Sequence, residues 1–358
     1  MKVVQILYPG LGGTSNVAFS IVEGQKYVKK KFSNFFIFNG NEDLLKQHQI
    51  KCKKKRINFF YKNLSFPFST TLEIFKKLKE INPEIIINHS NSVFPTFIFK
   101  YFSKTKVLYV DHTPDKTRYY IDWLKSFFSW LMSDGVVFVS QKKKNSFILK
   151  IMSFFKIKYR VILNATNLDD YKKNDSNNYI FKVGMAARFV DDKLQKILLE
   201  IFDSDKDYFK KNKIFLTLAG DGPNYLKYKN EYKKNPQIKI VGNLNEKKLK
   251  KWFENLSCYV HISKDETTST SVLQSMAAGV PLVLSKVDGN ISLLSVLGIT
   301  KLCKLVRNDK LKIKKAIISV YLNKNKFIKN SEIIKKKIKD KIDIKNFTNK
   351  YLNMIKDI

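Results

Sequence analysis

The sequence predicts an α/β protein made of two doubly wound, Rossmann-like domains. Short apolar segments rich in β-branched and aromatic residues alternate with helical segments, and this alternation predicts parallel sheets covered by helices on both faces. The length of 358 residues exceeds what one ordinary core supports, and a polar segment at 164–178 interrupts the alternation. We therefore expect a first domain at 1–166, a second at 167–340 and a C-terminal helical segment at 341–358.

Strand candidates occur in both halves of the chain. In the first half they are 3–7, 35–38, 57–61, 84–88, 106–110, 135–139 and 159–163. In the second half they are 180–185, 214–219, 238–241, 259–262 and 281–284. Ligands of open α/β sheets bind outside the carboxyl ends of the strands. We therefore expect the active-site residues in the loops that follow these strands.

Composition limits the class of protein. Apolar residues make up 44% of the chain, which is enough for buried cores. The first apolar run meets glycines at once instead of forming a signal segment, no apolar run is long enough to span a bilayer, and three cysteines are scattered outside metal-ligand spacing. These features predict a cytoplasmic, globular protein.

The net charge of +36 has three interpretations. Lysine greatly outnumbers arginine and is spread along the whole chain, which is typical of solvated faces. An anionic membrane surface is the second interpretation. Nucleic acid is the third, and the scarcity of arginine argues against it.

The loop after the first strand candidate contains Gly12, Gly13 and Thr14. Glycines let a backbone approach a ligand, and the start of the following helix favours an anion, with Thr14 or Ser15 available as N-cap. The loop is not a dinucleotide fingerprint, because Ser15 stands where the third glycine would be. A plain tight turn and an anion site both remain open.

Two further loops follow strands of the second half. Arg188 and Lys193 stand together after the strand at 180–185 and would suit a diphosphate clamp or a solvated surface. The run 218–223 contains Gly220 and Gly222, which predicts a turn with positive φ that packs closely on a neighbouring loop.

The most informative segment is 263–281. A helix from about Thr270 to 278 should end at a glycine with Pro281 just beyond. The amides of Thr270 and Ser271 would form an anion site at its start. Glu266 precedes this helix and Gln274 lies about one turn into it, so both can reach one ligand.

With these motifs the chain resembles the retaining GT-B glycosyltransferases of family 4. Their second domain carries two glutamates separated by seven residues, then a small-residue run with Met, Gly and Pro, which Glu266 and 275–281 match. The segments 184–193, 218–223 and 241–242 match other family motifs in order. The resemblance covers most of the chain.

The resemblance implies two domains that face each other across a cleft and a C-terminal helix that crosses back to the first. It assigns catalytic contacts with the sugar to His112 and Glu266, and a place beside the acceptor to Gly12, Gly13 and Thr14. It assigns the nucleotide-sugar donor to a larger set: Arg188, Lys193, Gly242, Thr268, Ser269, Thr270, Ser271 and Gln274.

The implied activity is transfer of a sugar, with retention, from a UDP-linked donor to a glycan or lipid-linked glycan, in the synthesis of bacterial surface polysaccharide such as lipopolysaccharide, or of a glycoconjugate. The Arg and Lys clamp would replace a metal, so neither metal nor cofactor is expected. Two departures stand out: Gln274 replaces the second glutamate, and Thr267 and Ser269 replace glycines. For a lipid-linked acceptor, the basic aromatic stretches 29–36 and 51–62 would hold the enzyme on the inner face of the cytoplasmic membrane.

Two other classes remain as alternatives. A nucleotide-sugar epimerase of the same architecture would use carboxylates for acid/base chemistry, and a basic nucleic-acid-binding protein would use the charge alone. Taken alone, His112 is more typical of a buried structural histidine, and His89, at the end of another strand, is interpreted as structural.

Overall fold

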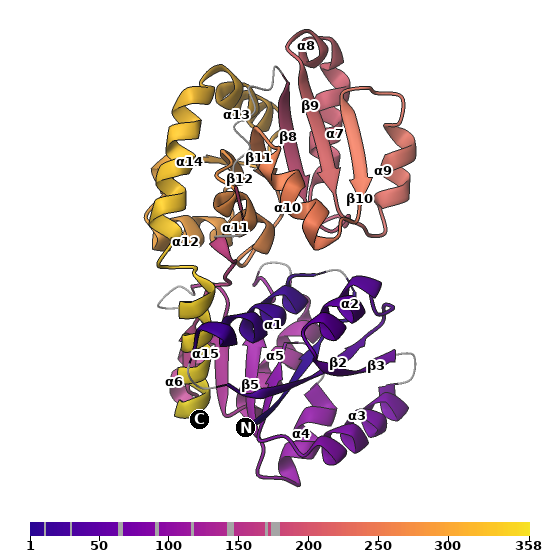
Figure 1. The fold of residues 1–358 in the computed structure, drawn as a ribbon, viewed down its shortest axis with the longest axis vertical. Coiled ribbons are helices and arrows are strands. Elements are labelled where there is room, and N and C mark those ends of the chain that lie inside the picture. The colour runs from indigo at the N-terminus through magenta and orange to yellow at the C-terminus, as the bar shows by residue number, and fades with distance from the viewer. Residues whose placement is uncertain are drawn as a thin grey trace. The chain divides into compact units, whose positions relative to one another are not determined.

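The computed structural model describes residues 1–10, 12–28, 31–63, 67–89, 93–115, 118–141, 147–168, 171–172 and 180–358. Part of the predicted polar segment at 164–178, and Lys29 and Lys30 of the first basic stretch, lie outside these ranges. Two compact units make up the chain (Figure 1). The first unit comprises Met1–Ala165 and Ile344–Ile358, and the second comprises Thr166–Asp343.

A parallel sheet forms the centre of the first unit. Its described strands are β1 (Lys2–Leu7), β2 (Ser33–Gly40), β3 (Asn58–Asn63), β4 (Ile85–Asn88), β5 (Lys106–Asp111), β6 (Gly135–Phe138) and β7 (Tyr159–Val161). Their order is β3-β2-β1-β4-β5-β6-β7. Because the chain starts in the middle and winds outward in both directions, the order confirms a doubly wound fold.

The central strands of this sheet are buried on both faces. In β1, Val3 packs into one apolar cluster, whereas Val4 and Ile6 pack into another. Successive side chains of a strand point to opposite faces. The apolar side chains of β1 therefore fill two cores, as expected of a parallel strand covered on both sides.

Helices cover both faces of the first sheet. They are α1 (Gly13–Gly24), α2 (Lys46–Lys54), α3 (Pro67–Ile81), α4 (Val93–Tyr101), α5 (Tyr120–Met132), α6 (Phe147–Phe154) and α15 (Ile344–Asp357). The last helix, α15, lies beside α1 (Figure 1). A Cβ on Gly24 would lie 1.8 Å from the Thr348 hydroxyl oxygen, so glycine permits this close approach.

The second unit has its own parallel sheet. Its described strands are β8 (Phe181–Ala186), β9 (Ile214–Ala219), β10 (Ile238–Gly242), β11 (Cys258–His261), β12 (Leu282–Ser285) and β13 (Lys304–Val306). Their order is β10-β9-β8-β11-β12-β13. The order is doubly wound again, and it places the ends of β8 and β11 side by side. The predicted fold class is therefore confirmed in both units.

The helices of the second unit are α7 (Gln195–Ser204), α8 (Lys206–Lys211), α9 (Tyr225–Glu231), α10 (Glu246–Glu254), α11 (Thr270–Ala277), α12 (Asp288–Leu297), α13 (Lys310–Leu322) and α14 (Lys324–Ile338). Ile313 and Ile317 of α13 join the core that β8 and β9 build. Their spacing of one helical turn is what the sequence showed. In the described part of the chain, no helix has the length and apolar character needed to cross a membrane.

Candidate functional site

The loops after β8 and β11 bring Lys193 and Glu266 together. Lys193 lies between β8 and α7, and Glu266 between β11 and α11. The ammonium Nζ donates to Glu266 Oε2 at 2.5 Å. Because β8 and β11 are neighbouring parallel strands, residues 73 positions apart meet at the carboxyl ends of these strands.

Glu266 is a shielded anion. Its side chain is 10% exposed, and burial by itself would raise the pKa of its carboxyl. Lys193 and a hydrogen bond with His261 outweigh burial and hold the pKa well below its usual range. Glu266 is therefore ionised at physiological pH, with two donors on one oxygen.

A chain of hydrogen bonds runs from Glu266 into the core of the second unit. His261 Nε2 lies 2.9 Å from Glu266 Oε2, and His261 Nδ1 lies 3.1 Å from the Tyr259 hydroxyl. Burial lowers the pKa of His261, so the ring is neutral. The carboxylate can only accept, so Nε2 carries the proton and Nδ1 is an acceptor. The Tyr259 hydroxyl has two acceptors within reach of its one proton, His261 Nδ1 and the Ala186 carbonyl, each at 3.1 Å. The Ala186 amide donates to the same hydroxyl at 3.4 Å.

Helix α11 begins and ends where its caps predict. The Ser269 hydroxyl accepts from the amide of Val272 at 3.4 Å and contacts the Ser271 hydroxyl at 3.0 Å. The amides of Thr270 and Ser271 come before the first acceptor that the helix itself supplies. At the other end, Gly279 has a φ of 67°, the left-handed conformation that ends a helix.

Gly289 fixes the position of Glu266 from the other side. It lies in the first turn of α12, and a Cβ at this position would be 1.8 Å from the Glu266 carbonyl oxygen and 2.6 Å from that of Thr267. Any side chain at position 289 would displace this backbone. Helix α12 thus supports the loop that carries the carboxylate.

The Arg188 loop packs on the predicted glycine turn. A Cβ on Gly220 would lie 2.0 Å from the Ala187 carbonyl, and both Gly220 and Gly222 have positive φ, 136° and 147°. The Arg188 carbonyl accepts from the Gln195 side chain at 2.8 Å. This confirms the predicted close packing and gives the Arg188 backbone a fixed place.

The remaining donor candidates lie on the same unit. Gly242 ends β10 with a φ of 73°, and its carbonyl accepts from the Gly220 amide at 2.9 Å. Thr268 is buried in the loop before α11, and Gln274 is half-buried on α11. The described contacts join Lys193 to Glu266, Ser269 to Ser271 and Gly242 to the Gly220 turn. They give no such contact for Gln274.

In the first unit, His112 is paired with His89. His112 directly follows β5 and His89 directly follows β4, and His89 Nδ1 lies 3.2 Å from His112 Nε2. Burial lowers the pKa of His112 to about 4, and burial, aided by His112, holds the pKa of His89 well below its usual range. Both rings are therefore neutral, and one proton lies between His89 Nδ1 and His112 Nε2.

Neighbouring amides determine which nitrogen of each ring carries the proton. Gln5 Nε2 donates to Asn34 Oδ1 at 2.8 Å, so Gln5 Oε1 faces His89 Nε2, 3.0 Å away. His89 Nε2 must then donate, His89 Nδ1 must accept, and His112 Nε2 must donate to it. The Nδ1 of His112 is then the unprotonated nitrogen of its ring.

The backbone after β5 is held by a buried ion pair. Arg118 Nη2 contacts the two carboxylate oxygens of Asp111 at 2.5 and 2.7 Å and the Thr113 carbonyl at 2.8 Å. Both charged side chains are fully shielded. Asp111 and Thr113 flank His112, so this pair holds the loop that carries the histidine.

The glycine loop before α1 differs from its prediction in one respect. Gly12 is the N-cap of α1, without a side-chain cap, and Ser15 donates to the Tyr8 carbonyl at 3.2 Å instead. The predicted N-cap at Thr14 or Ser15 is therefore wrong. A Cβ on Gly12 or Gly13 would meet nothing within 4 Å, so packing within the described residues does not require glycine there.

Sequence reasoning missed His261 and Gly289, and it interpreted His89 as structural. His261 ends the strand that precedes the Glu266 loop, whereas His89 meets His112 because β4 and β5 are neighbours. The described residues contain no group of side chains suited to a metal ion. Cys52, Cys258 and Cys303 are buried, and burial raises the pKa of the Cys52 thiol to about 12.

Comparison with known proteins gives one family match. Residues 166–340 match the family described as glycosyl transferases group 1. No curated relative matches the chain in sequence.

Solved structures resemble the whole chain. HepE from Anabaena, in complex with UDP-glucose, has a TM-score of 0.80 at 12% identity, and the match covers 100% of both chains. A glycosyltransferase from Rickettsia africae has a TM-score of 0.71 at 16% identity, with 99% of this chain and 98% of that chain covered. A mutant of S. aureus TarM, in complex with fondaparinux, alpha-GlcNAc-glycerol and UDP, has a TM-score of 0.72 at 12% identity over 99% of each chain. The chain thus has the GT-B fold of these glycosyltransferases.

Proposed function

We propose that the chain is a retaining glycosyltransferase whose second unit binds a nucleotide-sugar donor, because residues 166–340 match the family described as glycosyl transferases group 1. The match to glycosyl transferases favours transfer over the epimerase alternative. The observation that carries the proposal is the cluster of Lys193, Glu266 and His261 at the ends of β8 and β11. It stands where open α/β sheets bind their ligands.

We propose a role for each residue that binds the nucleotide-sugar donor. Lys193 and Arg188 neutralise the diphosphate, and the amides of Thr270 and Ser271 at the start of α11 donate to its oxygens. Glu266, held ionised, accepts from hydroxyl groups of the sugar. Gln274 contacts the ribose, and Gly242 lies at the base end of the site, next to Gly220. Thr268 and Ser269 form the loop beside the sugar.

We propose that transfer needs no metal ion. As the bond between the anomeric carbon and the phosphate oxygen breaks, the leaving diphosphate gains negative charge, and the cations and helix amides stabilise it. The same phosphate takes the proton of the acceptor hydroxyl as that oxygen bonds to the anomeric carbon. His112 of the first unit contributes by accepting a hydrogen bond from a sugar hydroxyl at Nδ1.

The ligands of similar solved structures support a proposal for the donor base, and the sequence resemblance supports one for the acceptor. HepE and TarM were solved with UDP or UDP-glucose, which supports a UDP-linked donor here. We propose a glycan or lipid-linked glycan as acceptor, placed near Gly12, Gly13 and Thr14, in bacterial surface polysaccharide synthesis such as that of lipopolysaccharide. A cytoplasmic enzyme held at the inner face of the membrane would meet such an acceptor.

A thermal-shift panel of nucleotides and nucleotide sugars tests the proposal. At least one nucleoside diphosphate should raise the Tm of the full chain, and Arg188→Ala and Lys193→Ala should remove most of that rise. As a matched control, Lys196→Ala removes an exposed lysine of α7 that pairs only with Glu200 among the described residues and should keep the rise. An equal rise in all variants would overturn the proposed site.

A further inference from the structure

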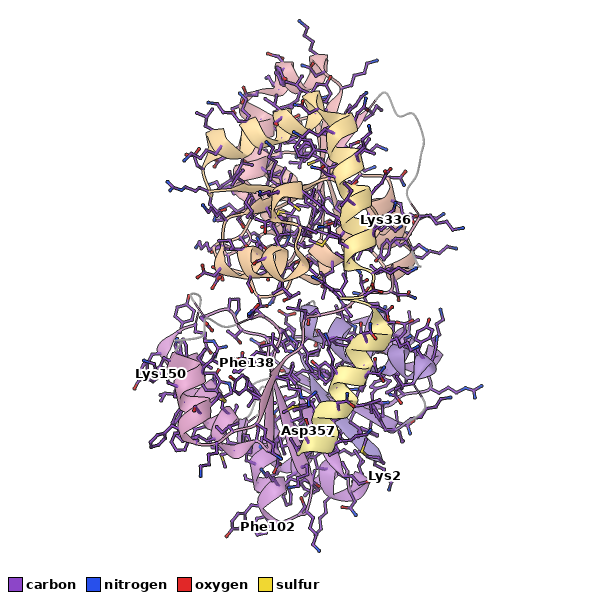
Figure 2. All side chains as sticks on the ribbon, turned by 90° about the vertical axis from the view of Figure 1, so that its left-hand side faces the viewer. Lys2, Phe102, Phe138, Lys150, Lys336 and Asp357 are labelled. Carbon is purple, nitrogen blue, oxygen red and sulfur yellow. The ribbon has the colours of Figure 1, made fainter. Side chains whose placement is uncertain are left out.

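Six exposed apolar side chains lie at or near the ends of α4, α5 and α6: Tyr101 (85%), Phe102 (73%), Phe128 (50%), Met132 (44%), Phe154 (81%) and Phe155 (47%). Other exposed apolar side chains, among them Phe94, Tyr119, Tyr120 and Phe147, lie where these helices begin. We call the first six residues the aromatic end. Figure 2 shows Phe102 at the outline of the first unit, with Lys150 of α6 also projecting outward.

Side-chain and backbone contacts join the three helix ends. Lys100 of α4 donates to the Met132 carbonyl at the end of α5 at 2.8 Å. The ring of Phe127 contacts those of Phe128 and Phe155, at 5.9 and 6.3 Å between centroids, and Phe155 contacts Phe154 at 5.0 Å. These contacts hold the ends of α4, α5 and α6 together, so the six side chains of the aromatic end lie on neighbouring helix ends.

Cations surround this patch. Lys104, Lys125 and Lys156 are exposed, and among the described residues none of them forms an ion pair. Asp134 also lies at this end, between α5 and β6, but Lys100 and Lys106 hold it at 3.0 and 3.5 Å. Aromatic side chains ringed by uncompensated lysines match the chemistry of an anionic bilayer surface, where rings enter the interface and lysines meet headgroups.

Aromatic side chains in the stretches that the sequence suggested for this role are less exposed. Phe32 and Phe36 of 29–36 are buried, at 7% and 0% exposure. In 51–62, Phe59 and Phe60 pack against the cores of the sheet. These aromatic side chains contribute to the packing of the fold, so the two stretches present less exposed ring surface than the aromatic end does.

A second copy of the chain fits this patch less well. A two-fold interface places the same surface of each copy against the other, so two patches that both carry Lys104, Lys125 and Lys156 would be brought together. Like charges across an interface oppose association. From the exposed rings and the uncompensated cations, we infer that the aromatic end docks on the surface of an anionic lipid bilayer.

Flotation with vesicles tests the inference on the full chain without nucleotide, so its outcome does not depend on the proposed enzyme activity. The wild type should float with vesicles of phosphatidylcholine and phosphatidylglycerol and stay behind with phosphatidylcholine alone. Phe102→Ser combined with Phe154→Ser should lower the partition coefficient at least about tenfold. The control pair Leu226→Ser and Leu322→Ser, exposed at 66% and 69% on the second unit, should leave it unchanged.

A charge-matched pair separates docking from diffuse attraction. Lys104→Glu with Lys156→Glu changes the net charge as much as Lys329→Glu with Lys336→Glu, which alters two exposed lysines of α14. Only the first pair should reduce binding, again about tenfold or more. Equal losses in both pairs, or aromatic variants that bind like the wild type, would overturn the inference. So would a lipid-free dimer that the aromatic variants dissociate, because the patch would then be an interface between copies.

Discussion

Lys193 Nζ and Glu266 Oε2 lie 2.5 Å apart, so the ammonium group assigned to phosphate and the carboxylate assigned to sugar are partners of each other. A diphosphate that binds Lys193 must compete with Glu266 for the same cation. His261, the second donor to that carboxylate oxygen, lets Glu266 stay ionised when the lysine turns to phosphate. The three residues thus form an exchangeable charge network.

Glu266→Gln should separate nucleotide binding from transfer. The substitution removes the competitor for Lys193, so the Kd for UDP should stay the same or fall by up to about tenfold. Sugar transfer should fall about a hundredfold, because the anion that contacts the sugar is gone. Calorimetry with UDP and a transfer assay measure the two quantities. A UDP affinity as weak as that of Lys193→Ala would contradict the competition.

His261→Phe should disturb Glu266 without touching substrate. The ring volume stays similar, but the carboxylate loses one donor and the Tyr259 hydroxyl loses one of its two acceptors, the other being the Ala186 carbonyl. We expect a loss of about 1–3 kcal/mol in stability and a lower kcat with little change in the Kd for UDP. Tyr259→Phe should lower kcat less, because it removes only the second bond of the chain. If kcat is unchanged in His261→Phe, the ring does not position Glu266.

Gly289→Ala should reduce transfer through the backbone of Glu266. The new methyl group would lie 1.8 Å from the Glu266 carbonyl oxygen, so the loop must move, at a cost of about 1–3 kcal/mol. Gly298→Ala is the control: its φ is 70° but a Cβ there meets nothing within 4 Å. Both variants should be less stable by denaturant unfolding, and only Gly289→Ala should lose transfer activity. Equal activities in the two would refute the support role of α12.

The proton positions of the histidine pair are open to direct observation. The chain has four histidines, so nitrogen NMR of the rings can be assigned by single substitutions. His112 should carry its proton on Nε2, and His89→Leu should let His112 exchange between both neutral forms. A proton on Nδ1 of His112 in the wild type would contradict the relay through Gln5 and Asn34.

Acid should destabilise the first unit through the same pair. Burial lowers the pKa of His112 to about 4, whereas imidazole in an unfolded chain titrates near ~6.5. Between these values the unfolded chain binds more protons, so the free energy of unfolding decreases as the pH falls, by at most about 1.4 kcal/mol per pH unit for this ring. Calorimetry should show a smaller acid-induced fall in Tm for His112→Gln. An unchanged fall would mean that His112 does not titrate in this way.

The fold class could be predicted because buried parallel strands appear in the sequence as short apolar segments. The apolar run of β1 feeds two cores, and Ser269 and Gly279 mark the ends of α11 at the expected places. Glu266 was found because a strand end, a small-residue loop and a helix start occur in one continuous segment.

The partners of these residues left no local signal. Lys193 meets Glu266 because β8 and β11 are neighbours, and His89 meets His112 because β4 and β5 are neighbours. Exposure is also set by tertiary packing: Phe36 is buried while Phe102 is exposed, although both stand in basic, aromatic sequence. These relationships depend on strand order, which a single sequence does not state.

Hydrogen exchange of the full chain with and without UDP tests the central claim most directly. The account predicts that UDP protects amides of the loop 187–194 and of the segment 266–273, where Lys193, Glu266 and the start of α11 lie, with less protection in Lys193→Ala. Protection confined to the first unit, or absent from both segments, would contradict it.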